Sequence, residues 1–188
     1  MQHERLKMLI NSALFAAIIG ILSQVSIPLP FSPVPITGQT LAIGLAATIL
    51  GKKYGTISLL LYLALGAIGI PVFAGGAAGF GVLVGSTGGY LIGFIPTIFI
   101  IAYYIEKTKF TVLNAMIANT IGMFVTLIFG TVWLKIAASL SWHDAMAFGF
   151  YPFIILGLVK AYVASALGVI IGKRLAKANL LKRDEISA

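Results

Sequence analysis

The chain of 188 residues has no cysteine, and only 10% of its residues are charged. Without cysteine there is no disulfide framework, no thiol nucleophile and no thiolate metal site. A soluble globular domain is charged at roughly a quarter of its positions. This composition, with 60% apolar residues and a mean hydropathy of +1.05, therefore excludes that class.

Charged residues are also absent from long continuous stretches. Three stretches have none at all: residues 8–51, 54–105 and 110–134. A single lysine, Lys160, interrupts a fourth, residues 145–172. A spanning helix needs about 20 apolar residues, so the first two stretches hold two spans each and the last two hold one each. The pattern does not alternate as barrel strands do. We therefore expect an all-α, polytopic membrane protein in which residues 1–188 form a single six-helix domain.

Proline and glycine place the expected helix ends, because proline lacks an N–H donor and restrains its predecessor. We expect helices at residues 6–27, 37–50, 54–70, 86–105, 111–135 and 149–176. The first is too long for a removable signal peptide and lacks its cleavage site, so we expect it to remain. The second and third helices are short for a hydrocarbon core of about 30 Å. The proline segment at residues 28–35 and the glycine segment at residues 72–85 should therefore dip into the protein and line a cavity.

Basic residues predict the orientation of the bundle. Eleven of the 13 Lys and Arg fall at one face: Arg5, Lys7, Lys52, Lys53, Lys107, Lys109, Lys173, Arg174, Lys177, Lys182 and Arg183. By the positive-inside rule this face is cytoplasmic, and six spans place both termini there. We expect a multi-pass protein of the cell membrane. The orientation of the protein in the membrane accounts for the excess of basic over acidic residues, so no nucleic-acid partner is implied.

Lys160 stands out because it lies inside the last expected helix. An ammonium at that depth costs several kcal/mol unless it finds water, a partner or a ligand. All five acids lie in expected loops or termini, so none can pair with it within a span. The lysine either extends to the outer surface or faces a cavity that holds an anionic or carbonyl-bearing ligand. We favour the cavity.

Uncharged polar residues accompany this lysine. Gln39, Thr87 and Tyr90 follow the proline and glycine segments, and Asn119 lies within the fifth helix. Such side chains often serve only as interhelical hydrogen bonds, but their grouping predicts an outward cavity for a small molecule. Gly75 and Gly76 belong to a turn whose amides could bind a ligand or that merely connects helices. That turn lacks the Gly-Lys-Ser/Thr ending of a phosphate loop.

The first helix carries two rows of small residues, Ser12-x-x-x-Ala16-x-x-x-Gly20 and Ala13-x-x-x-Ala17. Small residues let helices approach closely, either inside the bundle or with an external partner. No paired acids, serine dyad or metal-ligand set occurs within the spans, so an enzyme is the weakest interpretation. A stand-alone oligomeric carrier or channel is a stronger rival.

Five stretches resemble the BioY family, the biotin-specific substrate-binding (S) components of energy-coupling-factor (ECF) vitamin transporters. They are P-V-P-I-T-G-Q-T (33–40), G-I-P-V-F-A-G-G (69–76), G-V-L-V-G-S-T-G-G-Y-L-I-G-F (81–94), Trp133-Leu134 and L-V-K-A (158–161). The resemblance covers nearly the whole chain. It implies a six-helix bundle without enzymatic activity or cofactor, which binds biotin from outside between the glycine segment and the last three helices.

The resemblance also implies site residues and partners. The expected ligand-binding residues are Gln39, Gly75, Gly76, Thr87, Tyr90, Asn119 and Lys160. A transmembrane coupling protein driven by two ABC-type ATPases would dock on the small-residue face formed by Ala13, Ala16, Ala17 and Gly20. Lysine could meet either the carboxylate or the ureido oxygen of biotin.

Two positions depart from the family pattern. Ser86 stands where proline is usual, and Gly157 stands where an Asp usually precedes the lysine by three residues. An Asp there would suit the ureido N–H donors and would pair with Lys160. Its absence leaves a related small acid, such as a biotin precursor or a lipoate-like molecule, as an alternative ligand.

Overall fold

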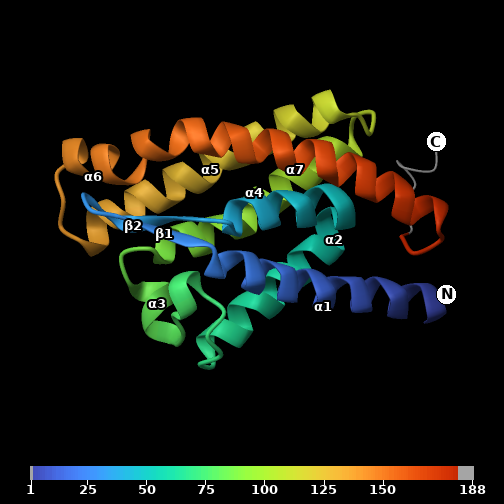
Figure 1. Ribbon diagram of the computed structural model, residues 1–188, viewed down its shortest axis with the longest axis horizontal. Helices are drawn as coiled ribbons and strands as arrows, with labels where there is room; N and C mark the ends of the chain where they lie inside the picture. Colours follow the sequence, from blue (N-terminus) through green and yellow to red (C-terminus); the bar gives the residue numbers. More distant parts are fainter. Residues whose placement is uncertain (1, 182–188) are drawn as a thin grey trace.

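The structure, a computed structural model, describes residues 2–181 and is mostly helical. In chain order its elements are α1 (Gln2–Gln24), β1 (Ser26–Leu29), β2 (Ser32–Thr37), α2 (Gln39–Ala67), the 3-10 helix η1 (Ala74–Gly76), α3 (Phe80–Val84), α4 (Gly88–Glu106), α5 (Val112–Ala137), α6 (Trp142–Gly149) and α7 (Tyr151–Lys177). The start of α1 and the end of α7 lie at one end of the bundle, the terminal end (Figure 1). The hairpin turn, α3 and α6 lie at the opposite end, the loop end. Lys182 and Arg183 of the expected basic face lie outside the described residues.

Four helical segments among the described residues are long and apolar enough to cross a membrane. They are Gln2–Gln24, Gly88–Glu106, Val112–Ala137 and the stretch Trp142–Lys177 that joins α6 and α7. The helices expected at residues 37–50 and 54–70 together form α2. The count of six spans stays a prediction.

Gly51 divides α2 into two halves. Its φ of 74° and ψ of −174° lie outside the helical region, and a positive φ of this size favours glycine. After this break the backbone N–H of Lys52 donates to Glu106 Oε1 at 3.1 Å, which ties the restart of the helix to the end of α4. The ammonium of Lys52 lies 3.7 Å from the second carboxylate oxygen. The boundary expected after residue 50 is therefore a sharp bend at one glycine, and α2 doubles back there (Figure 1).

The expectation of a purely helical chain is wrong at the proline segment, which forms an antiparallel hairpin. The paired residues are Ser26 with Thr37, Ile27 with Ile36, and Leu29 with Ser32. None of these is proline: the four prolines occupy the other positions of the hairpin, which leaves the N–H donors of the paired residues available. The first helix accordingly ends at Gln24 rather than at residue 27.

The last expected helix corresponds to α7, but a short helix that was not expected, α6, precedes it. Phe150, with φ −121° and ψ −65°, separates the short α6 from α7. Ser141 starts α6: its Oγ accepts the backbone N–H of Asp144 at 3.1 Å and donates to that residue's carboxylate at 2.7 Å. A serine followed three residues later by an acid is a helix-start pattern, so the sequence did hold this signal.

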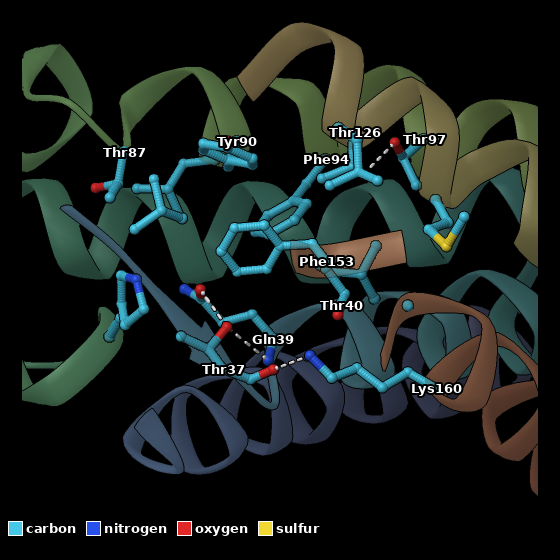
Figure 2. A pocket seen from close by; sticks show the side chains of 18 of the residues that line it. Thr37, Gln39, Thr40, Thr87, Tyr90, Phe94, Thr97, Thr126, Phe153 and Lys160 are labelled. Atoms are coloured by element: carbon cyan, nitrogen blue, oxygen red, sulfur yellow. Dashed lines mark hydrogen bonds between the residues drawn. The ribbon is translucent and has the colours of Figure 1, made fainter. Parts of the chain in front are cut away.

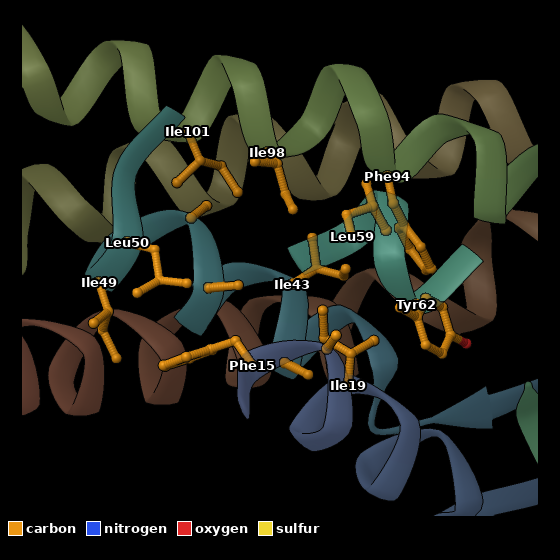
Figure 3. Close-up of a cluster of buried hydrophobic side chains, with 14 of the residues drawn as sticks. Phe15, Ile19, Ile43, Ile49, Leu50, Leu59, Tyr62, Phe94, Ile98 and Ile101 are labelled. Carbon is orange, nitrogen blue, oxygen red and sulfur yellow. The ribbon is translucent and has the colours of Figure 1, made fainter. Parts of the chain in front are cut away.

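The main core lies where α1, α2 and α4 meet, with branched and aromatic side chains in contact (Figure 3). Ile19, Ile43, Leu59 and Ile98 are each 1% exposed or less. Because this core holds both halves of α2 against α1 and α4, it fixes the positions of Gln39 at the start of α2 and Tyr62 in its second half.

Candidate ligand-binding site

A cavity of about 330 Å³ lies between the hairpin, α2, α4, α5 and α7. This volume falls within the range of small-molecule sites, roughly 300–1,000 Å³. Aromatic and aliphatic side chains form most of its wall, among them Phe73, Tyr90, Leu91, Phe94, Leu127 and Phe153. It extends along α4 from Thr87 at the loop end to Ile101, roughly 20 Å by helical rise. The cavity therefore suits an elongated ligand with an apolar body.

Lys160 points into this cavity from α7 (Figure 2). Its Nζ donates to the backbone carbonyl oxygen of Thr37, on the hairpin, at 2.7 Å. None of the ion pairs among residues 2–181 includes this lysine. The position facing a cavity is therefore confirmed, and the alternative in which the side chain extends to the outer surface is wrong. An ammonium retains two further N–H donors for a ligand.

Gln39 lies beside this lysine and is 6% exposed. Its Nε2 donates to the hydroxyl of Tyr62 at 2.6 Å, and its Oε1 accepts the Thr37 hydroxyl at 3.0 Å. These two bonds fix which way the amide points into the cavity (Figure 2). The Tyr62 ring in turn meets Phe73 edge-on, with ring centroids 5.5 Å apart.

Thr87 and Tyr90 both line the loop end of the cavity. The Tyr90 hydroxyl donates to the backbone carbonyl of Gly149 at 2.7 Å, at the end of α6. Its ring lies directly on Gly130, where an added Cβ would be 2.1 Å from the ring. Tyr90 is therefore a fixed wall with its hydroxyl already bonded, whereas the partly exposed Thr87 makes no side-chain hydrogen bond within residues 2–181.

Asn119 lines the deeper part of the cavity, but its amide nitrogen is engaged between helices. The Nδ2 atom lies within hydrogen-bonding distance of Thr48 Oγ1 at 3.1 Å, Ser165 Oγ at 3.1 Å and the Ala115 carbonyl at 2.9 Å. These contacts join α5 to α2 and α7. The amide nitrogen of Asn119 therefore makes interhelical contacts, as one of the two interpretations expected. Ligand contact through Asn119 stays a prediction.

Gly75 and Gly76 do not line the cavity in this conformation, although Ala74 and Ala77 on either side of them do. Both glycines are exposed, with φ values of 65° and 78°. They shape the turn at η1 that carries the alanines over the cavity. Their direct contact with a ligand stays a prediction.

The loop before η1 is attached to the end of α1. The Ser23 hydroxyl donates to the carbonyl of Val72, and Gln24 Nε2 donates to the carbonyl of Phe73 at 3.3 Å. Phe73 is fully buried against Gly66, where an added Cβ would be 2.1 Å from its ring. One wall of the cavity is thus anchored to α1.

The two small-residue rows of α1 face different ways. Ala13 and Ala17 are exposed, whereas Ala16 and Gly20 are buried. An added Cβ at Gly20 would be 3.4 Å from Val72, so that row packs inside the bundle. In this conformation a partner helix can therefore reach Ala13 and Ala17 but not Ala16 or Gly20.

Sequence reasoning missed several residues of the cavity wall. They include Thr40, Phe73, Phe94, Thr97, Met123, Thr126 and Phe153. One signal was available: Phe153, Gly157, Lys160 and Ala161 follow the spacing of one helix face, and all line the cavity. Within residues 2–181 no three His, Asp or Glu side chains gather as a metal site would require.

Comparison with known proteins connects this chain to a family. Residues 1–177 match the BioY family. The chain is 40% identical over 179 residues to "Biotin transporter BioY2" of Lactococcus lactis, covering 95% of this chain and 97% of the relative. It is 38% identical to "Biotin transporter BioY" of Thermotoga maritima, covering 87% and 95%. Its fold matches a crystal structure described as the S-component for biotin from an ECF-type ABC transporter, with a TM-score of 0.78, 32% identity and 94% of each chain covered.

Proposed function

This chain belongs to the BioY family, and we propose that it captures biotin in the cavity beside Lys160 for uptake by an ECF-type transporter. Its relatives are named as biotin transporters, which is a transport function rather than catalysis. The observation that carries the proposal for this chain is the ammonium of Lys160, which faces a largely apolar cavity and whose only acceptor among residues 2–181 is a backbone carbonyl.

Biotin matches the chemistry of the cavity. Its thioether ring and the methylene groups of its valerate chain are apolar, and they fit a wall made largely of aromatic and aliphatic side chains. Its carboxylate and its ureido oxygen both accept hydrogen bonds, and Lys160 and the Gln39 amide are the polar groups held at one level of the cavity (Figure 2). Of the two acceptors, the carboxylate would also neutralise the lysine.

We propose that biotin enters at the loop end, between the segment carrying η1 and α3 and the ends of α4, α5 and α7. Ala74, Ala77, Ser86 and Thr87 line the cavity at this end. Apart from Lys135 and Lys160, the Lys and Arg residues of the described chain lie toward the terminal end, so the positive-inside rule supports an outward loop end. We propose six spans in the cell membrane with this orientation.

The chain has no nucleotide-binding motif, so the energy for uptake must come from partners. A transmembrane coupling protein and two ABC-type ATPases are the partners we propose, in keeping with the S-component structure that this fold matches. The exposed row of Ala13 and Ala17 is the surface we propose for docking, because small side chains permit close helix contact.

Native mass spectrometry of the purified protein tests the ligand directly. We expect the protein purified from biotin-supplied cells to carry a bound species of the mass of biotin, and the same species to exchange with added labelled biotin. A co-purified acid of another mass that biotin cannot displace would instead favour the related-ligand alternative, to which Gly157 lends weight. ATP-independent uptake by the chain alone would favour a stand-alone carrier.

A further inference from the structure

Met123 lies directly on the backbone of Gly157, across the contact between α5 and α7. A Cβ added at Gly157 would be 2.4 Å from the Met123 sulfur and 2.9 Å from its Cγ. Both residues line the cavity, and Met123 is 8% exposed. The thioether therefore occupies the space that a side chain at position 157 would otherwise fill.

This contact lies one helical turn from the cavity lysine. Gly157 precedes Lys160 by three residues on α7, so both face the cavity from the same side of the helix. Met123 itself packs with Tyr90 and Leu127 in an apolar cluster. The part of the wall at Gly157, one helical turn before Lys160, is thus a polarisable thioether over a bare backbone.

A larger side chain at position 157 must affect the ligand, because it displaces Met123. A contact below 3.0 Å forces a neighbour to move, and methionine moves readily because its unbranched side chain has three rotatable bonds. Met123 belongs to a packed cluster with Tyr90, Leu127 and Leu134 and also lines the cavity, so the cavity is the free volume into which it can move. The residue type at position 157 therefore sets the width of the cavity through the position of Met123.

We infer that Met123, seated on Gly157, is a specificity-determining residue of the ligand site. It selects a ligand whose apolar, polarisable body, such as a sulfur-containing ring, lies against this wall while a carbonyl or carboxylate meets Lys160. A ligand that turns an N–H or O–H donor toward the thioether leaves that donor without a good acceptor. The inference rests on the proposed binding of biotin.

Four variants test the contact by isothermal titration of the detergent-solubilised protein with biotin: Gly157→Ala, Met123→Ala, the double variant, and Gly168→Ala. Gly168 is the matched control, because it lies on the same helix and an added Cβ would be 2.7 Å from Thr48, outside the cavity. We expect Gly157→Ala to weaken biotin binding about tenfold through crowding. The double variant should return to within about threefold of Met123→Ala, and Gly168→Ala should bind within about twofold of the wild type.

Selectivity supplies a second readout. Dethiobiotin retains the carboxylate and the ureido group of biotin but lacks its sulfur. The ratio of the two dissociation constants should change at least about threefold in Met123→Ala and stay unchanged in Gly168→Ala. An unchanged ratio in Met123→Ala, or a double variant no better than Gly157→Ala, overturns the inference. Absence of biotin binding in the wild type as well overturns the proposed function itself, and is thereby distinguished from failure of the Met123–Gly157 contact alone.

Discussion

The ammonium of Lys160 and the backbone carbonyl of Thr37 are 2.7 Å apart, and this hydrogen bond joins α7 to the hairpin across the cavity. Thr37 also donates its hydroxyl to Gln39, so one short segment of hairpin orients both polar groups of the site. A neutral carbonyl solvates a cation without cancelling its charge. The pair therefore holds the ammonium in place while leaving its charge for a ligand to neutralise.

Replacing Tyr62 with Phe should weaken the site without altering its shape. The substitution removes the hydroxyl that accepts from Gln39 Nε2 at 2.6 Å but keeps the ring that packs against Phe73. We expect a loss of about 1 kcal/mol in the free energy of unfolding and a several-fold weaker affinity for biotin, because the amide loses its fixed orientation. Thermal unfolding and calorimetric titration measure the two effects. Tyr162→Phe, at an exposed tyrosine of α7, is the control, and identical behaviour of the two variants would contradict the account.

Replacing Asn119 with Ala should affect stability more than ligand binding. The amide nitrogen bridges Thr48 and Ser165, and interhelical hydrogen bonds of this kind contribute about 1 kcal/mol. We expect a lower unfolding temperature with biotin affinity within about threefold of the wild type. Asn114→Ala removes only a solvent-exposed hydrogen bond to the carbonyl of Lys109 at the start of α5, and it should change neither quantity appreciably. A large loss of affinity at unchanged stability would instead make Asn119 a ligand-binding residue.

Replacing Ala13 and Ala17 together with Trp should block assembly with the coupling protein and spare biotin binding. Both alanines are exposed on α1 and do not line the cavity, so bulk there obstructs only an approaching helix. Co-purification with the coupling protein and ATPases measures assembly, and titration with biotin measures binding. Leu14→Trp places the same bulk on another exposed part of α1 and should assemble normally. Normal assembly of the double variant would remove this row from the interface.

The helical regions were predictable because the length of a segment without charged residues determines whether it can span a membrane as a helix. The bend at Gly51 was predictable in place, from Lys52 and Lys53, but the sequence does not show that one glycine with positive φ makes it. The hairpin was missed because four prolines were interpreted only as helix breakers. The prolines occupy unpaired positions of the hairpin, and which positions pair depends on residues across the turn.

The candidate site was predicted best at polar residues that are rare in apolar helices. It was predicted worst at apolar residues whose roles depend on packing between helices. A lysine in an apolar helix is conspicuous, and Gln39 follows a break, so both could be found from the sequence. Phe73 and Met123 are ordinary apolar residues whose roles depend on which glycine they meet, Gly66 or Gly157, and such contacts between helices leave no local signal. The same holds for Ala16 and Gly20, which share the spacing of the exposed row but face inward.

The most direct measurement is the affinity of biotin for the wild type and for Lys160→Ala, determined side by side in detergent. Lys173→Ala, which removes a charge from the same helix at the terminal end, is the matched control. The account predicts that Lys160→Ala binds biotin more than tenfold less tightly, about 1.4 kcal/mol, while Lys173→Ala binds as the wild type does. Equal affinity of Lys160→Ala and the wild type would contradict the central claim that this ammonium holds the ligand.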